Sequence, residues 1–119
     1  MAETKTVFDL NVFKRAYWVS LEIHRVSLGF PKLEQYATGD QIRRASKSIC
    51  ANLAEGLGRK TSAAEQKRFI GMAEGSCQEV RVWLRYCVDL DLITKEQWSE
   101  WQNEYKEIAM MLNGLAKTR

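Results

Sequence analysis

A single proline, Pro31, interrupts a sequence that can otherwise be helical throughout. Proline cannot continue a helix, and the surrounding segment 28–40, LGFPKLEQYATGD, also contains two glycines. The sequence has no runs of alternating apolar and polar residues between turn signals, which would indicate strands. It therefore predicts an all-α protein with one pronounced break near residue 31.

Four amphipathic segments follow from the helical spacing of the apolar residues, and they span residues 12–28, 41–55, 62–90 and 94–115. The expected N-terminal caps are Asn11, Asp40, the pair Ser62 and Glu65, and the pair Thr94 and Gln97. No helix can bury its apolar face alone, so the segments should pack together. The expected architecture is an antiparallel four-helix bundle with up-down-up-down topology, and the link around Pro31 could cover one end.

The apolar positions of each segment predict the core. The expected core residues are Val12, Ala16, Val19, Ile23, Val26, Ile42, Ala45, Ile49, Leu53, Phe69, Ala73, Val80, Leu84, Cys87, Trp98, Trp101, Tyr105, Ile108, Leu112 and Leu115. Among them Trp98, Trp101 and Tyr105 should lie largely inside, since their spacing is that of a bundle seam.

The length of 119 residues suits one hydrophobic core, so we expect one domain over residues 1–119, with a flexible segment at residues 1–10. No apolar run approaches the length of a membrane span and the first residues lack a signal-peptide pattern, which favours the cytoplasm. The cysteines Cys50, Cys77 and Cys87 are odd in number and occupy apolar helical positions. They are expected to be reduced thiols that fill the core.

Candidate catalytic groups are few. The chain has one histidine, His24, and no Glu-x-x-His motif, which excludes the di-iron centre of some helical bundles. Residues 56–62, GLGRKTS, lack the adjacent Gly-Lys and the preceding strand of a phosphate-binding P-loop. We therefore expect no catalytic residues, no metal and no cofactor, although a cysteine paired with His24 stays open because sequence gives no distances.

The two glycines of this corner have a structural explanation. Gly56 or Gly58 is expected to adopt the left-handed conformation that ends the second helix. The N-terminus of the third helix then lies beside Arg59 and Lys60, where its free N–H groups and the two cations suit an anion. A solvated basic corner is the alternative interpretation.

Positive charge is concentrated in one part of the sequence. Residues 41–68 contain seven basic and two acidic residues, a net charge of +5, whereas the remainder carries −2 of the total +3. The candidate nucleic-acid-binding residues are Arg43, Arg44, Lys47, Arg59, Lys60 and Lys67. We expect the first three on the solvent side of the second helix, and binding that is independent of base sequence because no aromatic platform accompanies them. A solvated basic face is again the alternative.

Two further stripes predict self-association. Apart from its core face, the first helix carries the apolar residues Phe13, Tyr17, Leu21 and Leu28. The third helix carries Gly71, Gly75 and Val82 away from its core face. One bundle cannot easily bury both faces of a helix, and glycines four residues apart allow close backbone approach. We expect a homo-oligomer with these residues at its interface.

A polar motif, Asn52, Glu55 and Arg59, lies at the end of the second helix. Arg59 could fold back onto Glu55, which would make the motif a structural lock. A binding site at this corner is the alternative.

Several short motifs follow one another in a characteristic order and spacing. They are Phe30-Pro31, the segment QIRRA at 41–45, the segment NLAEGLGR at 52–59, and Gly75-Ser76 followed by Glu79. Together they resemble the four-helix-bundle family named for proteins encoded in intervening sequences of bacterial 23S ribosomal RNA genes. The resemblance covers residues 30 to about 84.

This resemblance implies a homopentameric ring, with a dimer as the alternative on general grounds, and no known enzymatic activity. Some relatives are accessory proteins of diversity-generating retroelements and look like basic binders of nucleic acid and reverse transcriptase. The leading hypothesis is a non-enzymatic oligomeric scaffold that binds structured RNA or DNA. A scaffold for a partner protein without nucleic acid is the alternative, and an enzyme is the third.

Overall fold

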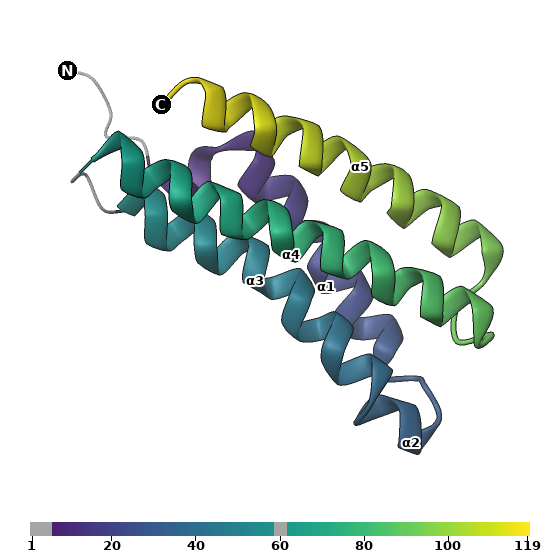
Figure 1. Ribbon diagram of the computed structural model, residues 1–119. Helices are drawn as coiled ribbons and strands as arrows, with labels where there is room; N and C mark the ends of the chain where they lie inside the picture. Colours follow the sequence, from purple (N-terminus) through teal and green to yellow (C-terminus); the bar gives the residue numbers. More distant parts are fainter. Residues whose placement is uncertain (1–5, 59–61) are drawn as a thin grey trace.

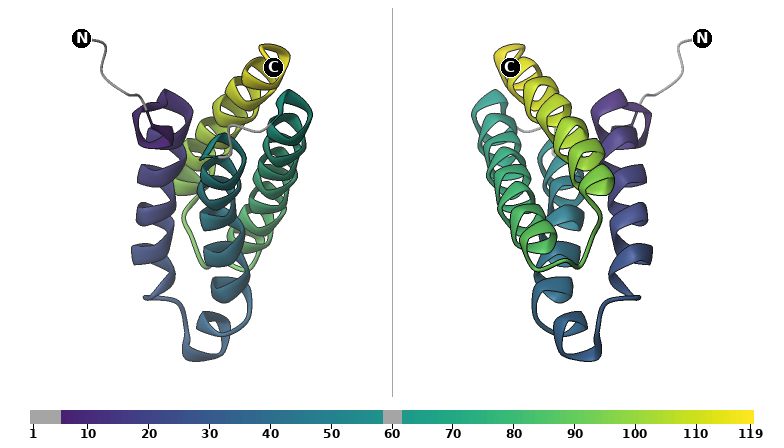
Figure 2. Two further views of the ribbon diagram at one scale, coloured as in Figure 1. Left: turned by 90° about the vertical axis from the view of Figure 1, so that its left-hand side faces the viewer. Right: turned by 90° about the vertical axis from the view of Figure 1, so that its right-hand side faces the viewer.

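The computed structural model describes residues 6–58 and 62–119. Its four long helices are α1 (Asn11–Ser27), α3 (Thr38–Gly58), α4 (Ala63–Asp89) and α5 (Lys95–Lys117), and its short ones are η1 (Val7–Asp9) and α2 (Lys32–Gln35) (Figure 1). Successive long helices run in opposite directions, and each contacts its neighbours in the order α1, α3, α4, α5 and back to α1 (Figure 2). The predicted all-α, up-down-up-down bundle is confirmed.

The predicted helix boundaries lie within three residues of the observed ones. Two of the predicted caps are confirmed: Ser62 Oγ accepts a hydrogen bond from the Glu65 N–H at 3.0 Å, and Thr94 forms a complete capping box with Gln97. The other two are wrong. Asn11 is the first residue of α1, after Leu10, and Asp40 lies inside the first turn of α3 because that helix already begins at Thr38.

The break at Pro31 forms a cover for one end of the bundle. Pro31 occupies the N-cap position of α2, and the preceding Phe30 is buried in the core. The Gln35 side chain donates from Nε2 to the carbonyl oxygens of Leu28 and Phe30 at 2.9 and 2.8 Å. These bonds hold the link against the end of α1, so the loop satisfies its own backbone groups.

The core follows the predicted faces closely. All four long helices contribute fully buried side chains, among them Ile23, Ile49, Leu84 and Tyr105. Trp101 and Tyr105 lie inside as predicted, whereas Trp98 is only half-buried at the α4–α5 edge. Of the other predicted core residues, Val26 and Leu115 are half-buried and the rest are buried.

The prediction that Gly56 or Gly58 ends α3 in a left-handed conformation is wrong. α3 continues through both, and no glycine in the described ranges has a positive φ. Gly56 instead allows α3 and α4 to touch, since an added Cβ would lie 2.4 Å from the Cβ of Phe69. The left-handed residue is Asp91, φ 58°, in the turn between α4 and α5.

Candidate nucleic-acid interface

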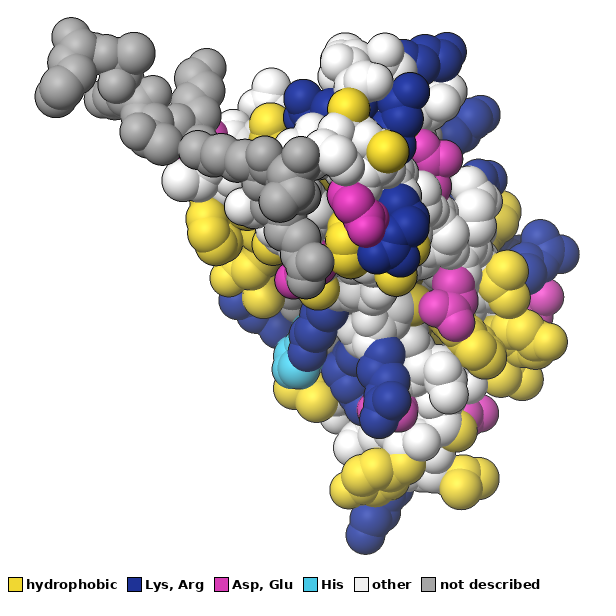
Figure 3. All heavy atoms as spheres, turned by 60° about the vertical axis from the view of Figure 1, so that its left-hand side comes forward, with side chains coloured by type: hydrophobic (Ala, Val, Ile, Leu, Met, Phe, Trp, Pro, Cys, Tyr) yellow, Lys and Arg dark blue, Asp and Glu magenta, His cyan; other side chains and the backbone are white. Residues whose placement is uncertain are grey.

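The C-terminal half of α1 and the N-terminal half of α3 together carry a basic face, which we define as His24, Arg25, Arg43, Arg44 and Lys47. The two helices run antiparallel and in contact, which brings residues 24–25 opposite residues 43–47. Figure 3 shows Lys and Arg side chains gathered on this side of the molecule, near the histidine. The sequence prediction missed the contribution of α1. The signal available was the antiparallel pairing of the two helices around Pro31.

His24 is the center of the face. Its Nδ1 lies 3.0 Å from Lys47 Nζ, so the ammonium group donates and the imidazole accepts. Desolvation lowers the pKa of His24, and the positive charges of Lys47, Arg43 and Arg25 lower it further. Both effects favour the neutral form of the imidazole, and the three cations act on it from α1 and α3.

Arg43 does not lie free on the solvent side of α3, as the sequence predicted. Its guanidinium donates to Ser27 Oγ at 2.8 Å and to the Gln35 carbonyl oxygen at 2.6 Å. It thereby joins α1, the cover helix α2 and α3. The reason is the turn after Pro31, which brings carbonyl groups within reach of this position. Arg43 adds charge to the face but holds the fold together.

The other predicted binding residues are placed as follows. Lys47 and Arg44 are exposed, and Arg44 Nε pairs with Asp40 at 3.1 Å within one turn of α3. Lys67 is also exposed but lies near the start of α4, at the opposite end of the bundle from α2. Arg59 and Lys60, and with them the expected anion site at the corner, lie outside the described residues.

The part of the polar motif around Asn52 links α3 to α4. Asn52 Nδ2 donates to the backbone oxygen and the hydroxyl of Ser48 at 2.9 and 3.0 Å. The Ser48 hydroxyl in turn lies 2.8 Å from that of Ser76 on α4. Asn52 and Ser76 thus meet through Ser48, and the arrangement locks α3 to α4. The predicted pairing of Arg59 with Glu55 falls outside the described residues.

The second stripe of α1 is only partly exposed. Phe13 is 7% exposed because η1 covers it, with the Phe8 ring packed edge-on against it at 5.1 Å. The single chain therefore buries this residue, contrary to the expectation. Leu21 is half-buried, whereas Tyr17 and Leu28 are exposed. An apolar groove of about 320 Å³ runs between α1 and α3, lined by Phe8, Phe13, Tyr17, Ser20, Leu21, Lys47, Cys50, Ala51 and Ala54.

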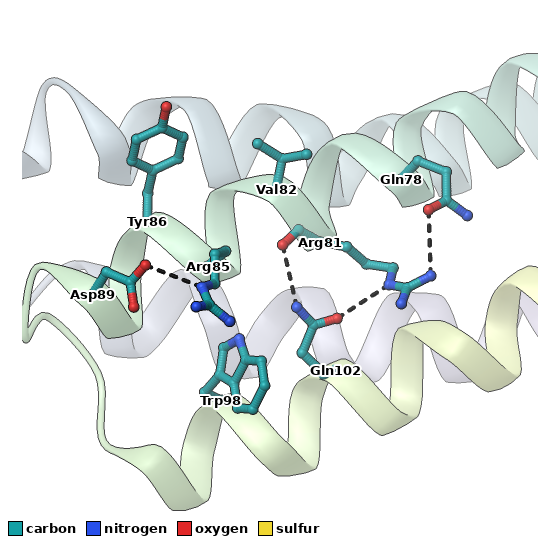
Figure 4. A pocket seen from close by; sticks show the side chains of 8 residues that line it. All are labelled: Gln78, Arg81, Val82, Arg85, Tyr86, Asp89, Trp98 and Gln102. Atoms are coloured by element: carbon teal, nitrogen blue, oxygen red, sulfur yellow. Dashed lines mark hydrogen bonds and ion pairs between the residues drawn. The ribbon is translucent and has the colours of Figure 1, made fainter.

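The outer stripe of α4 is exposed as predicted. Gly71 and Gly75 face open space, and Val82 continues their line toward the C-terminal half of the helix. There the stripe borders a groove of about 690 Å³ between α4 and α5, which we call the basic groove. Its lining residues are Gln78, Arg81, Val82, Arg85, Tyr86, Asp89, Trp98 and Gln102 (Figure 4). The sequence analysis missed this groove, although its two arginines are spaced one helical turn apart.

A second groove, of about 280 Å³, lies between α1 and α5, and we call it the acidic groove. It is lined by Lys14, Arg15, Trp18, Val19, Glu22, Glu100, Trp101 and Glu104. Arg15 binds both carboxylate oxygens of Glu104, at 2.9 and 2.7 Å. One oxygen of Glu22 accepts the indole N–H of Trp101 at 3.0 Å.

The thiols behave as core side chains. Cys77 and Cys87 are buried and Cys50 is half-buried, and none of them forms a disulfide. Burial raises the pKa of Cys50 and of Cys77 to about 11 and that of Cys87 to about 12, so all three are neutral at physiological pH. Across residues 6–58 and 62–119, no cluster of three or more His, Cys, Asp or Glu side chains could hold a metal ion. No described helix has the length and apolarity needed to cross a membrane.

Comparisons with known proteins agree with the fold. The family model described as 23S rRNA-intervening sequence protein matches residues 8–114. A crystal structure from Bacteroides thetaiotaomicron, of a protein with unknown function from the S23 ribosomal protein family, superposes with a TM-score of 0.79 at 23% sequence identity. The match covers 89% of this chain and 98% of that one. A comparison with curated proteins found no match.

Proposed function

The chain belongs to the 23S rRNA-intervening sequence protein family, and from that premise we propose that it is a self-associating helical scaffold that binds structured RNA or DNA through its basic face. One observation carries the proposal: the basic face gathers cations from α1 and α3 around His24, with Lys47 Nζ 3.0 Å from the imidazole Nδ1 and the charges of Arg43 and Arg25 also acting on the ring. A surface that gathers several cations attracts the phosphates of a polyanion.

The basic face can contact phosphates but offers little for base recognition. Arg25, Arg44 and Lys47 are exposed and can approach a sugar-phosphate backbone. No aromatic ring belongs to the defined face, so binding is expected to be largely independent of sequence. In an oligomer the same face would recur in each subunit, and weak attraction at one site would add up along a structured nucleic acid. The proposal assigns no reaction to the protein.

The proposed assembly is a homopentameric ring in the cytoplasm, with a dimer as the alternative. Exposed apolar residues on two helices support self-association: Trp18 on α1 with Leu28 directly after its end, and Val82 and Tyr86 on α4. Exposed apolar patches often mark protein–protein contacts.

The test compares two triple variants of equal charge change. Arg25→Ala, Arg44→Ala and Lys47→Ala together remove the exposed cations of the basic face, whereas Lys95→Ala, Lys106→Ala and Lys117→Ala remove three exposed cations from α5. Binding of a fluorescent RNA hairpin is measured by anisotropy over a range of salt concentrations. The first variant should bind more weakly, with the slope of log K against log salt shallower by about 2 to 3, while the control keeps most of the wild-type slope.

The molecular mass from light scattering should be the same for both variants as for the wild type. If the wild type binds neither RNA nor DNA at low salt, or if the control variant loses as much affinity as the first, nucleic-acid binding through the basic face is refuted.

The apolar groove between α1 and α3 favours the second candidate function, a scaffold for a partner protein without nucleic acid. Its lining is mostly apolar, with Phe8 and Tyr17 exposed at its edge. Such grooves receive the apolar face of an amphipathic helix. A wild type that forms oligomers but binds no nucleic acid would support this alternative.

A further inference from the structure

We infer that copies of this chain associate head to tail, with Trp18 and the acidic groove of one copy docked into the basic groove of the next. The inference rests on the self-association in the proposed function, and it names the two surfaces that meet and the direction in which they meet. It follows from the charges, the exposed aromatic residues and the positions of the two grooves.

The basic groove holds a cation that the described part of the chain does not neutralise. Arg81 donates from Nε to Gln102 Oε1 at 3.1 Å and from Nη1 to Gln78 Oε1 at 3.3 Å, so both acceptors are uncharged amides (Figure 4). Gln102 also donates from Nε2 to the Arg81 carbonyl oxygen at 3.3 Å. The guanidinium is thus fixed in position while its charge remains available to a carboxylate.

The neighbouring residues complete a docking surface around Arg81. Arg85 pairs with Asp89 at 3.0 Å and lies over the Trp98 ring, 5.9 Å from its centroid. Val82 and Tyr86 are each 53% exposed at the rim. With a volume of about 690 Å³, the groove has room for an aromatic side chain. A cation beside apolar and aromatic surface suits an occupant that brings a ring together with carboxylates.

The acidic groove carries that combination. Trp18 is 62% exposed beside it, an unusual state for a side chain of this size. Glu100 is exposed, and so is Glu22, whose hydrogen-bond partner, the Trp101 indole N–H, carries no charge. Glu104 is already neutralised by Arg15. Lys14 is the remaining cation of the lining, so two carboxylates outnumber it.

The positions of the grooves dictate the type of assembly. Both use the same two turns of α5, since Trp98 and Gln102 line one groove and Glu100 and Glu104 line the other. They therefore lie at the same height along the bundle but on adjacent sides of it. A surface cannot meet itself here, so the contact is heterologous. Because the two grooves lie at one height, the repeated contact can close into a ring where the rotation between neighbouring copies divides a full turn evenly.

The glycine stripe of α4 is continuous with the basic groove. Gly71, Gly75, Val82 and Asp89 follow one another at spacings of four, seven and seven residues, which place them on one helical face. No atom lies within 4 Å of a Cβ built on either glycine. A helix of the next copy could therefore approach the N-terminal half of α4 closely while Trp18 occupies the groove.

The experiment reverses the charges on each surface in turn and then on both. One variant carries Arg81→Glu with Arg85→Glu, the second Glu22→Lys with Glu100→Lys, and the third all four changes. The control variant, Lys106→Glu with Lys117→Glu, alters exposed positions nearer the C-terminal end of α5. Masses are measured by light scattering at micromolar concentration, and circular dichroism verifies that each variant is helical.

Each single-surface variant should fall to the monomer mass of 13.8 kDa, because like charges then face each other across the contact. The fourfold variant restores opposite charges and should regain the wild-type mass, and the control should never lose it. Trp18→Ala tests the contact without changing any charge. It removes a ring that is exposed in the single chain. It should raise the dissociation constant of the oligomer about thirtyfold.

Two outcomes separate this inference from the proposed function. A wild type that forms oligomers, with charge variants and Trp18→Ala that keep its mass and dissociation constant, overturns the head-to-tail contact and leaves the scaffold proposal standing. A wild type that is monomeric at these concentrations overturns self-association itself, and the contact with it.

Discussion

At the scale of single residues, two helical glycines differ in the space around them. Gly56 faces Phe69 across the α3–α4 contact, where an added Cβ would lie 2.4 Å from the Phe69 Cβ. A Cβ on Gly114, in α5, would meet no atom within 4 Å. The first glycine is required by close approach of two helices, and the second only weakens its helix.

Gly56→Ala should therefore reduce the free energy of unfolding by about 1 to 3 kcal/mol, because α3 and α4 must move apart to accept the methyl group. Gly114→Ala should raise it by about 0.5 to 1 kcal/mol through the better helix propensity of alanine. Urea denaturation followed by circular dichroism measures both. Equal effects of the two substitutions would contradict the close contact at Gly56.

At the scale of the elements, helical periodicity was sufficient to predict the four long helices and most of the core. Ile49, Leu84 and Ile108 each lie on the apolar face of their helix, which can be buried only against the other helices. Their burial therefore follows from the spacing of the apolar residues alone. The short elements could not be predicted in this way. Neither α2 nor η1 has enough residues to show a period, and both are defined by their contacts with the bundle.

These short elements also explain the residues whose roles were misjudged. Arg43 was expected among solvent-facing cations, but the turn into α2 presents the Gln35 carbonyl oxygen to its guanidinium. Phe13 was expected outside the core, but Phe8 of η1 covers it. The basic and acidic grooves were missed because each combines side chains from two helices that are distant in the sequence. The spacing of residues within one helix does not show which residues of a neighbouring helix lie beside them.

Arg43 and its neighbour Arg44 form a matched pair for testing the link between α1, α2 and α3. Arg43→Ala removes two short hydrogen bonds and leaves the Ser27 hydroxyl and the Gln35 carbonyl oxygen without this donor, so it should cost about 1 to 3 kcal/mol of unfolding free energy. Arg44→Ala removes only an exposed pair with Asp40 and should change stability by less than about 0.5 kcal/mol. Thermal unfolding distinguishes them. A loss at Arg44 as large as at Arg43 would contradict the assigned link.

At the scale of the whole molecule, charge is organised on separate sides of the bundle. The basic face lies on α1 and α3, whereas the two grooves flank α5. A ring joined through the grooves would therefore leave the basic face of every subunit available for nucleic acid. This separation predicts that substitutions in the grooves lower the mass of the oligomer directly. They should weaken RNA binding only because a smaller assembly presents fewer basic faces to one RNA molecule.

His24 connects the charge of the basic face to pH. In the free protein its pKa is lowered by desolvation and by Lys47, Arg43 and Arg25, so the imidazole binds a proton less readily than an isolated one. Phosphate groups bound among these cations would neutralise them and raise that pKa. The complex then binds more protons than the free protein at pH values between the two pKa values, and linkage requires the association constant to rise as the pH falls through this window.

Affinity for an RNA hairpin should therefore increase between about pH 7.5 and about pH 5.5, with a slope of log K against pH no steeper than about −1 for each subunit engaged, since one group titrates. His24→Gln keeps a polar side chain of similar reach without the titration and should flatten this dependence while preserving affinity at the higher pH. Anisotropy titrations at constant ionic strength measure both proteins. The coupling is refuted if the wild type shows no dependence on pH in this range, or if His24→Gln shows the same slope as the wild type.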